Sequence, residues 1–320
     1  MTASRDPPAT DADHVSDRFS VSRILFATDG SPGAEAAAAH AVELADRTGA
    51  VLHVLAVVEG ERVASFASEG MRRQVRTRAA VEGEEAAATA ARRATAAGVH
   101  ALTAVEEGDP AAVVADFAAD VDAEVVVVGT RGRTGDERFA LGSVAEELLD
   151  RVASAVLAVP IDDDGDDDAG AVTPSYRRLL LATDGEATTR RATAAALSLA
   201  AAYGADVDAL SVVDERVGRT PDARASLDAS ARETVERVAM EGASVGLSVA
   251  PRVETGVPAA RILDVADAGT DLVVVGARRP ADAETHPLGS VSRRVVRGSP
   301  VPVLVVRGET DGAAAKRGDE

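Results

Sequence analysis

Residues 124–143, EVVVVGTRGRTGDERFALGS, decide the fold of this 320-residue chain. The four valines at 125–128 form a run too continuous for a strand with one solvent face. Such a run indicates a central strand of a parallel sheet covered on both faces. The strand ends at Gly129, and an amphipathic segment begins at Ser143 after a glycine-spaced loop. The stretch therefore predicts a strand, a loop and a helix start within an α/β sheet.

The loop of this stretch has the features of an anion site. Its glycines follow the spacing G-x2-G-x9-G-S, and glycine lets a backbone approach a ligand closely. A helix start offers unpaired N–H groups and partial positive charge, which favour a phosphate. Ser143 is a natural N-cap whose hydroxyl could serve the helix or a phosphate oxygen, and Arg131 and Arg133 add positive charge. The alternative is a glycine-rich turn before an ordinary capped helix.

A second candidate loop lies upstream in residues 23–31, RILFATDGS. A short apolar strand over residues 24–27 leads into Thr28, Asp29 and Gly30. One role for Asp29 is that of a helix N-cap. In an open α/β sheet, however, ligands bind outside the carboxyl ends of strands where the strand order reverses. Asp29 could then accept a ribose hydroxyl while the loop from Gly129 to Ser143 holds phosphates.

Together these motifs resemble a known family. The strand followed by TDGS, the VVVVGTRGR stretch, the full glycine spacing and the closing strand SAVLAVPI are similar to a universal stress protein domain of the ATP-binding type. The resemblance covers residues 21–160, and a second copy covers about 177–307. It implies two Rossmann-like (adenine nucleotide alpha hydrolase-like) α/β domains in tandem. Each would be an open parallel five-stranded sheet of strand order 3-2-1-4-5.

The resemblance also implies where the nucleotide binds in the first domain. Val57 matches the strand end whose backbone contacts adenine in family members, although its side chain can equally be read as a plain core valine. The expected nucleotide-binding residues are Ala27, Thr28, Asp29, Val57, Gly129, Arg131, Gly132, Arg133, Gly142, Ser143 and Val144.

The second copy departs from the motif at one glycine. Its TDG repeat and central strand are intact, but Arg279 stands where the spacing requires the second glycine. An arginine side chain removes the open backbone approach and is itself a cation. We expect a degenerate second site, unless Arg279 points to solvent and ATP still binds. The matching residues are Asp184, Val212, Gly276, Arg279, Gly289 and Ser290.

The chain divides into two domains and three polar segments. We expect a disordered arm at residues 1–20, domains at 21–160 and 176–308, and a disordered tail at 309–320. The acidic linker at 161–175 contains IDDDGDDDAG, which cannot bury a core. A calcium loop is the sharper reading of these aspartates, but the EF-hand spacing and its closing glutamate are absent.

Composition bounds the partners and the compartment. The formal charge of −19 argues against a nucleic-acid partner. No cysteine is present, so disulfide and thiol chemistry are excluded. No segment has the features of a signal peptide or a membrane span, so we expect a cytoplasmic protein. Acidity with a single lysine suggests a cytoplasm of very high salt, where charge repulsion is screened. The alternative is a merely acidic protein from a GC-rich genome.

The sequence favours binding over catalysis. It contains no Walker-A lysine, G-x-S-x-G or H-E-x-x-H motif. We expect an ATP-binding stress-response module, with Mg²⁺ or Mn²⁺ accompanying the nucleotide. A slow ATPase or phosphotransferase and a nucleotide-independent protein-interaction scaffold are the alternatives. The apolar last strands, 155–159 and 301–306, should pair with each other as an intramolecular pseudo-dimer, and association into a homodimer stays open.

Overall fold

The computed structural model describes residues 19–59, 68–130, 141–160, 173–217, 220–277 and 288–308. Strands and helices alternate through both halves, as the apolar runs and helix signals predict. The first half comprises β1 (Arg23–Thr28), α1 (Pro32–Thr48), β2 (Val51–Val58), α2 (Glu69–Ala96), β3 (Ala101–Glu107), α3 (Pro110–Asp120), β4 (Val125–Gly129), α4 (Ser143–Arg151) and β5 (Ala155–Val159). The second half comprises β6 (Arg178–Ala182), α5 (Ala187–Tyr203), β7 (Asp206–Asp214), α6 (Pro221–Ser244), β8 (Val249–Gly256), α7 (Pro258–Asp267), β9 (Leu272–Ala277), α8 (Ser290–Gly298) and β10 (Val303–Arg307).

The strands form one continuous sheet in the order β3-β2-β1-β4-β5-β10-β9-β6-β7-β8. Within each half the neighbouring strands are parallel and follow the predicted order 3-2-1-4-5. The halves meet where β5 pairs antiparallel with β10, with Val156 beside Val305. The predicted pairing of the last strands is therefore confirmed, and it merges the two expected five-stranded sheets into one.

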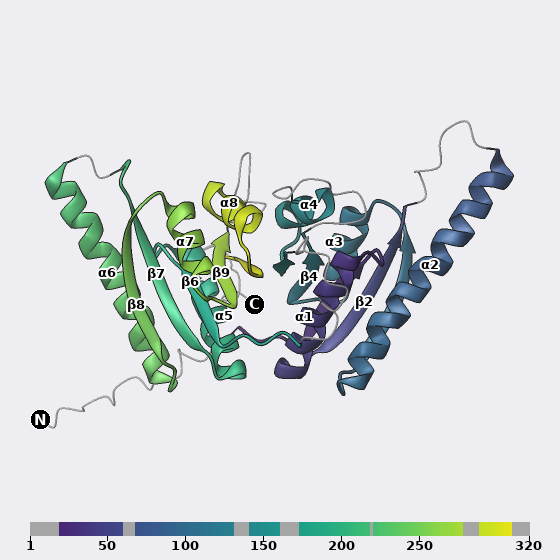
Figure 1. Ribbon diagram of the computed structural model, residues 1–320, viewed down its shortest axis with the longest axis horizontal. Helices are drawn as coiled ribbons and strands as arrows, with labels where there is room; N and C mark the ends of the chain where they lie inside the picture. Colours follow the sequence, from purple (N-terminus) through teal and green to yellow (C-terminus); the bar gives the residue numbers. More distant parts are fainter. Residues whose placement is uncertain are drawn as a thin grey trace, which may run out of the picture.

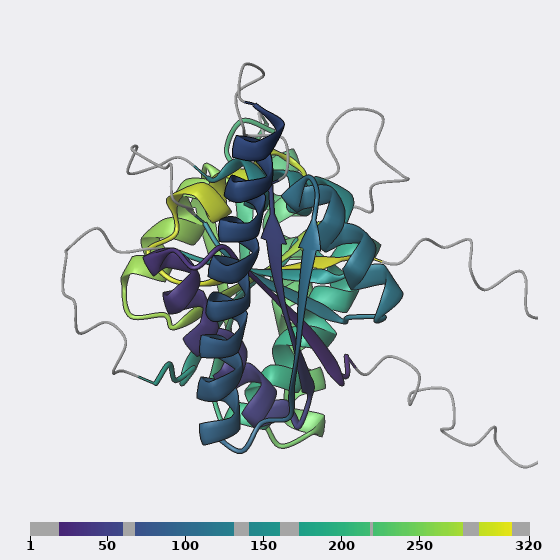
Figure 2. The ribbon, with the colours of Figure 1, turned by 90° about the vertical axis from the view of Figure 1, so that its right-hand side faces the viewer.

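Helices cover both faces of this sheet, and each face buries a core that runs through both halves. One core packs the sheet against α1, α2, α5 and α6, and the other packs it against α3, α4, α7 and α8. Figure 1 shows α2 and α6 on the outer flanks, with α4 and α8 on either side of the centre. Figure 2, seen from the side, shows α2 lying along its strands. The four valines at 125–128 are at most 4% exposed, as expected of a strand covered on both faces.

A carboxylate fixes the register between the first and fourth strands of each half. In the first half, Oε2 of Glu124 accepts hydrogen bonds from the backbone N–H groups of Ser22 and Arg23, at 3.1 and 2.7 Å. In the second half, Oδ2 of Asp271 accepts from the backbone N–H groups of Arg177 and Arg178, at 2.7 and 2.9 Å. Because charge-assisted bonds of this kind are strong, both repeats hold the amino ends of the same two strands together.

Candidate functional site

The first candidate site lies at the carboxyl ends of β1 and β4. These strands are parallel neighbours, with Phe26 beside Val127, so Thr28 and Gly129 end adjacent strands at one edge. From β1 the chain continues to β2 on one side, while β4 lies on the other. The strand order therefore reverses between β1 and β4, which is the place where open α/β sheets bind ligands.

The Asp29 loop is a tight turn held by its own side chains. Thr28 Oγ1 accepts a hydrogen bond from the N–H of Gly30 at 3.1 Å, and Asp29 Oδ1 accepts from the N–H of Ser31 at 2.9 Å. Gly30 has φ of 71°, which favours glycine. The N-cap of α1 is Ser31, whose hydroxyl accepts from the N–H of Ala34. The reading of Asp29 as a helix N-cap is therefore wrong, and Asp29 is exposed just beyond the carboxyl end of β1.

The start of α4 is tied to the end of β4. The N–H of Gly142 donates to the carbonyl of Thr130 at 2.5 Å, and the N–H of Thr130 donates to the carbonyl of Val159. Gly142 is the N-cap, with φ −59° and ψ 145°, and Ser143 is the first residue of the helix. The prediction that Ser143 caps α4 is wrong, because this backbone bond holds Gly142 extended and the helix begins one residue later. The α4 N-terminus still lies beside Gly129 at the switch point.

Three apolar members of the predicted site lie on one face of the sheet. Ala27, Val57 and Val144 are half-buried and pack against the core under α3 and α4. Because Thr28 pairs with Ala56 across β1 and β2, Val57 lies one residue beyond the end of β1. The structure thus brings the described members of the predicted site to the carboxyl ends of neighbouring strands, on the face of the sheet that α3 and α4 cover. Arg131, Gly132 and Arg133 lie outside the described residues.

The second half repeats the geometry of the Asp29 turn. Thr183 Oγ1 accepts from the N–H of Gly185 at 3.2 Å, and Asp184 Oδ1 accepts from the N–H of Glu186 at 3.0 Å. Val212 is half-buried against the same core as Val57. Gly276 lies in β9, Gly289 is the N-cap of α8 and Ser290 is its first residue. Arg279 lies outside the described residues.

Two details distinguish the second site from the first, and an ion pair lies at the end of β7. Ser292 Oγ donates to the carbonyl of Gly276 at 2.8 Å, whereas the equivalent residue of α4 is Ala145. Gly289 has φ of 71°, so that position itself favours glycine. At the end of β7, Arg216 donates to both oxygens of Asp214 and holds the pKa of that carboxyl down to about 2. The second site is therefore cross-linked between β9 and α8.

Metal ligands do not gather among the described residues at the first site. Within the described ranges, no three His, Cys, Asp or Glu side chains gather as metal ligands. A groove of about 330 Å³ lies between α3 and the C-terminal end of α4, lined mainly by alanines with Asp116 and Arg151. It lies at the other end of α4 from Ser143. No helix in the described part of the chain is long and apolar enough to cross a membrane.

Two polar clusters at the junction of the halves were not predicted. On one face, acidic residues of α4 meet arginines of α8 and β10. On the other face, His40 Nδ1 of α1 is 2.7 Å from the hydroxyl of Tyr176, and Arg47 lies over the ring of Tyr203. The second cluster joins residues more than a hundred positions apart and leaves no local pattern. The first leaves a signal in the sequence, because acids in one repeat stand where the other has arginines.

Comparison with known proteins agrees with this architecture. Residues 20–160 and 175–307 match the model of the universal stress protein family. A universal stress protein of Methanocaldococcus jannaschii is 34% identical over 137 residues, 43% of this chain and 81% of its own length. One from Mycolicibacterium smegmatis is 33% identical over 196 residues, 59% of this chain and 63% of its own.

A solved structure extends the likeness to both halves. A universal stress protein from Archaeoglobus fulgidus DSM 4304 aligns with 90% of this chain and 99% of its own at a TM-score of 0.71. Its sequence identity to this chain is 23%, so that likeness shows the fold.

Proposed function

The chain belongs to the universal stress protein family, and from that premise we propose that it is a stress-response regulatory module whose first domain binds ATP. The observation that carries the proposal is the meeting of three features at the β1–β4 switch point. These are the exposed carboxylate of Asp29, the end of β4 at Gly129 and the first N–H groups of α4. A nucleotide needs a hydroxyl acceptor and a phosphate site of this kind close together.

Each described residue has a role that its position supports. The carboxylate of Asp29 accepts a hydrogen bond from a ribose hydroxyl, and the backbone of Val57 contacts the edge of the adenine ring. Gly142 lets the phosphates approach the N-terminus of α4. Its φ of −59° is open to any residue, so its backbone conformation does not explain a glycine there. Close approach of a ligand does.

We propose that the second domain binds nucleotide weakly or not at all. Arg279 replaces the second motif glycine. The hydroxyl of Ser292 occupies the carbonyl of Gly276 and ties α8 to β9, which stiffens the crevice where phosphates would enter. These features favour nucleotide in the first domain alone.

The described residues fit a metal that arrives with the nucleotide better than a metal held by the protein. Asp29 is the acid at the site, and its Oδ1 already accepts the N–H of Ser31. We therefore propose that Mg²⁺ or Mn²⁺ is held mainly by phosphate oxygens and water, where it would neutralise phosphate charge.

The test is a count of bound nucleotide in two matched variants. The full chain is purified in concentrated KCl and denatured, and the released adenine nucleotides are quantified. We expect about one nucleotide per chain in the wild type, and ATP at about 100 times its dissociation constant should stabilise the first domain by about 2.7 kcal/mol. Asp29→Ala should lose both, because it removes the hydroxyl acceptor. Asp184→Ala, at the equivalent turn, should lose neither.

Two outcomes would change the assignment. Equal losses in the two variants would place nucleotide in both domains. No retained nucleotide and no thermal shift with added ATP would refute nucleotide binding and favour a protein-interaction scaffold.

A further inference from the structure

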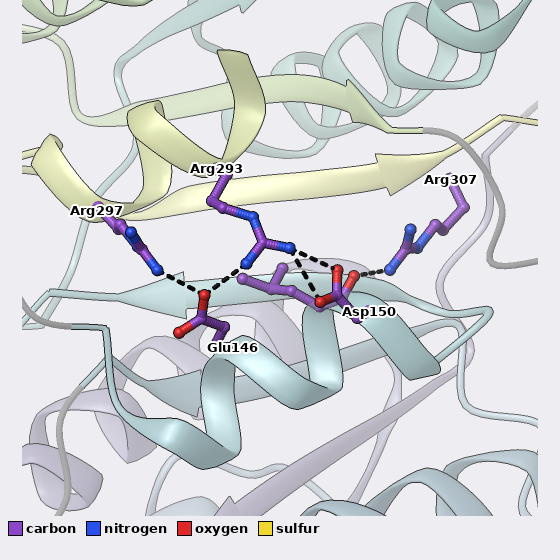
Figure 3. Close-up of polar contacts among 6 residues, drawn as sticks. Glu146, Asp150, Arg293, Arg297 and Arg307 are labelled. Atoms are coloured by element: carbon purple, nitrogen blue, oxygen red, sulfur yellow. Dashed lines mark hydrogen bonds and ion pairs between the residues drawn. The ribbon is translucent and has the colours of Figure 1, made fainter. Parts of the chain in front are cut away.

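Opposite charges face each other across the junction of the two halves. Arg293 of α8 donates to Glu146 of α4 at 2.5 Å and to Asp150 at 3.0 Å, and Arg297 donates to Glu146 at 2.5 Å. Figure 3 shows these side chains converging between α4 and α8, with Arg307 beside Asp150. The side chain of Arg293 is 21% exposed, so the cluster is partly withdrawn from water and is screened less than a surface pair.

The residues of this cluster occupy equivalent positions in the two repeats. Helices α4 and α8 begin at Ser143 and Ser290. Glu146 and Arg293 each lie three residues after that serine, and Asp150 and Arg297 each lie seven after it. The pair Glu146–Arg293 therefore joins the same position of both repeats. The approximate twofold rotation that relates the halves exchanges the contacts Arg293–Asp150 and Arg297–Glu146.

Like charges would meet if two identical domains joined through this edge. Two first domains would place Glu146 against Glu146, and two second domains would place Arg293 against Arg293. Like charges at this separation repel strongly when partly shielded from water. The strand ladder itself does not discriminate, because the paired residues of β5 and β10 are apolar and buried, and the ladder uses backbone groups.

Arg307 is a further charge at the junction that only the second half carries. It lies at the end of β10, is 1% exposed and donates to the carbonyl of Leu149 in α4. Strand register places Val306 beside Gly276 and Val159 beside Gly129, so the first half has Pro160 at the equivalent position. A pair of second domains would bury two such guanidinium groups at one junction, at a high desolvation cost.

We propose that this cluster is a pairing code, by which the first domain accepts at its last strand only a domain with basic residues at both helix positions. That domain is the second half of the same chain, or of a second copy through reciprocal exchange. The proposal is independent of nucleotide binding. Specificity here comes from repulsion in the wrong pairs as much as from attraction in the right one.

Three full-length variants test the code. The acidic-junction variant carries Arg293→Glu and Arg297→Asp, and the basic-junction variant carries Glu146→Arg and Asp150→Arg. The exchanged variant carries all four changes and restores opposite charges. Pairs of chains with different affinity tags are co-expressed, and the second tag recovered on the first is measured. The probe is a second copy of the chain itself.

We expect acidic and basic variants to recover each other about tenfold more than acidic recovers acidic, or than wild type recovers wild type. The exchanged variant should behave as the wild type does, because its halves close within one chain. If a one-sided variant does not fold alone, its recovery as soluble protein on co-expression with the other supports the code, and continued failure refutes it. Equal recovery in like and unlike pairs would overturn the proposal.

Discussion

The burial of His40, beside Tyr176, makes the stability of the protein sensitive to mild acid. Burial lowers the pKa of His40 from 6.5 to about 4, so the imidazole is neutral in the folded protein at pH 5. The unfolded chain binds a proton near pH 6.5, and stability therefore falls as the pH drops from about 6.5 to 4. Above pH 6.5 His40 is neutral in both the folded and the unfolded protein, so it no longer lowers the free energy of unfolding. The difference in proton binding corresponds to a loss of about 2 kcal/mol at pH 5 and about 3 kcal/mol at pH 4.

The measurement compares the wild type with His40→Asn in urea unfolding at several pH values and constant KCl. Asparagine does not titrate, and its amide oxygen can still accept the hydrogen bond of the Tyr176 hydroxyl. Other groups titrate in both proteins, so the difference between the two curves isolates His40. We expect the wild type to lose about 2 kcal/mol more than the variant between pH 7.5 and pH 5. Parallel curves over that range would refute the assigned protonation state.

Three further experiments test the site and the junction. Gly142→Ala should weaken ATP binding while changing the free energy of unfolding by less than about 1 kcal/mol. Gly289→Ala should lower the free energy of unfolding by about 1–3 kcal/mol, through strain at its positive φ, and leave ATP binding unchanged. Isothermal titration measures the binding, and urea unfolding measures the stability. Ser292→Ala should destabilise the second domain by about 1 kcal/mol in the same unfolding assay, and a value near zero would argue against its bond to β9. A double-mutant cycle on Glu146 and Arg293 should give a coupling of about 1 kcal/mol that falls as KCl rises, and no coupling at low salt would contradict the contact.

The fold could be predicted from sequence because its signals are local and repeated. The run of four valines marked β4. Helices α3 and α6 each begin with a side-chain N-cap followed by proline, Asp109-Pro110 and Thr220-Pro221, which is a favoured helix start. The strand order 3-2-1-4-5 came from the resemblance to the family, and both halves have it. What local pattern could not supply was the exact start of α4. A backbone bond from Gly142 to Thr130 decides it, and the residues between them carry no sign of that bond.

The positions of the candidate site residues follow from topology, whereas the charged contacts of the junction do not. Strand ends and helix starts combine their residues through topology, so Asp29 and Gly129 could be placed together from the strand order alone. A charged residue on an amphipathic helix, such as Glu146, is by default assigned to solvent. Only a comparison of equivalent positions in the two repeats, after the last strands are paired, places it against Arg293. His40 needed the position of Tyr176, 136 residues away.

The junction and the proposed nucleotide site share the first turn of α4. Glu146 lies in that turn, where a negative side chain would repel a phosphate bound at the helix N-terminus. Both of its arginine partners come from α8, so the second domain offsets a charge that would otherwise oppose phosphate binding in the first. A binding event at one end of α4 and the ion pairs beside it must then influence each other by equal free energies. On this argument the second domain would contribute through its arginines to the nucleotide binding proposed for the first.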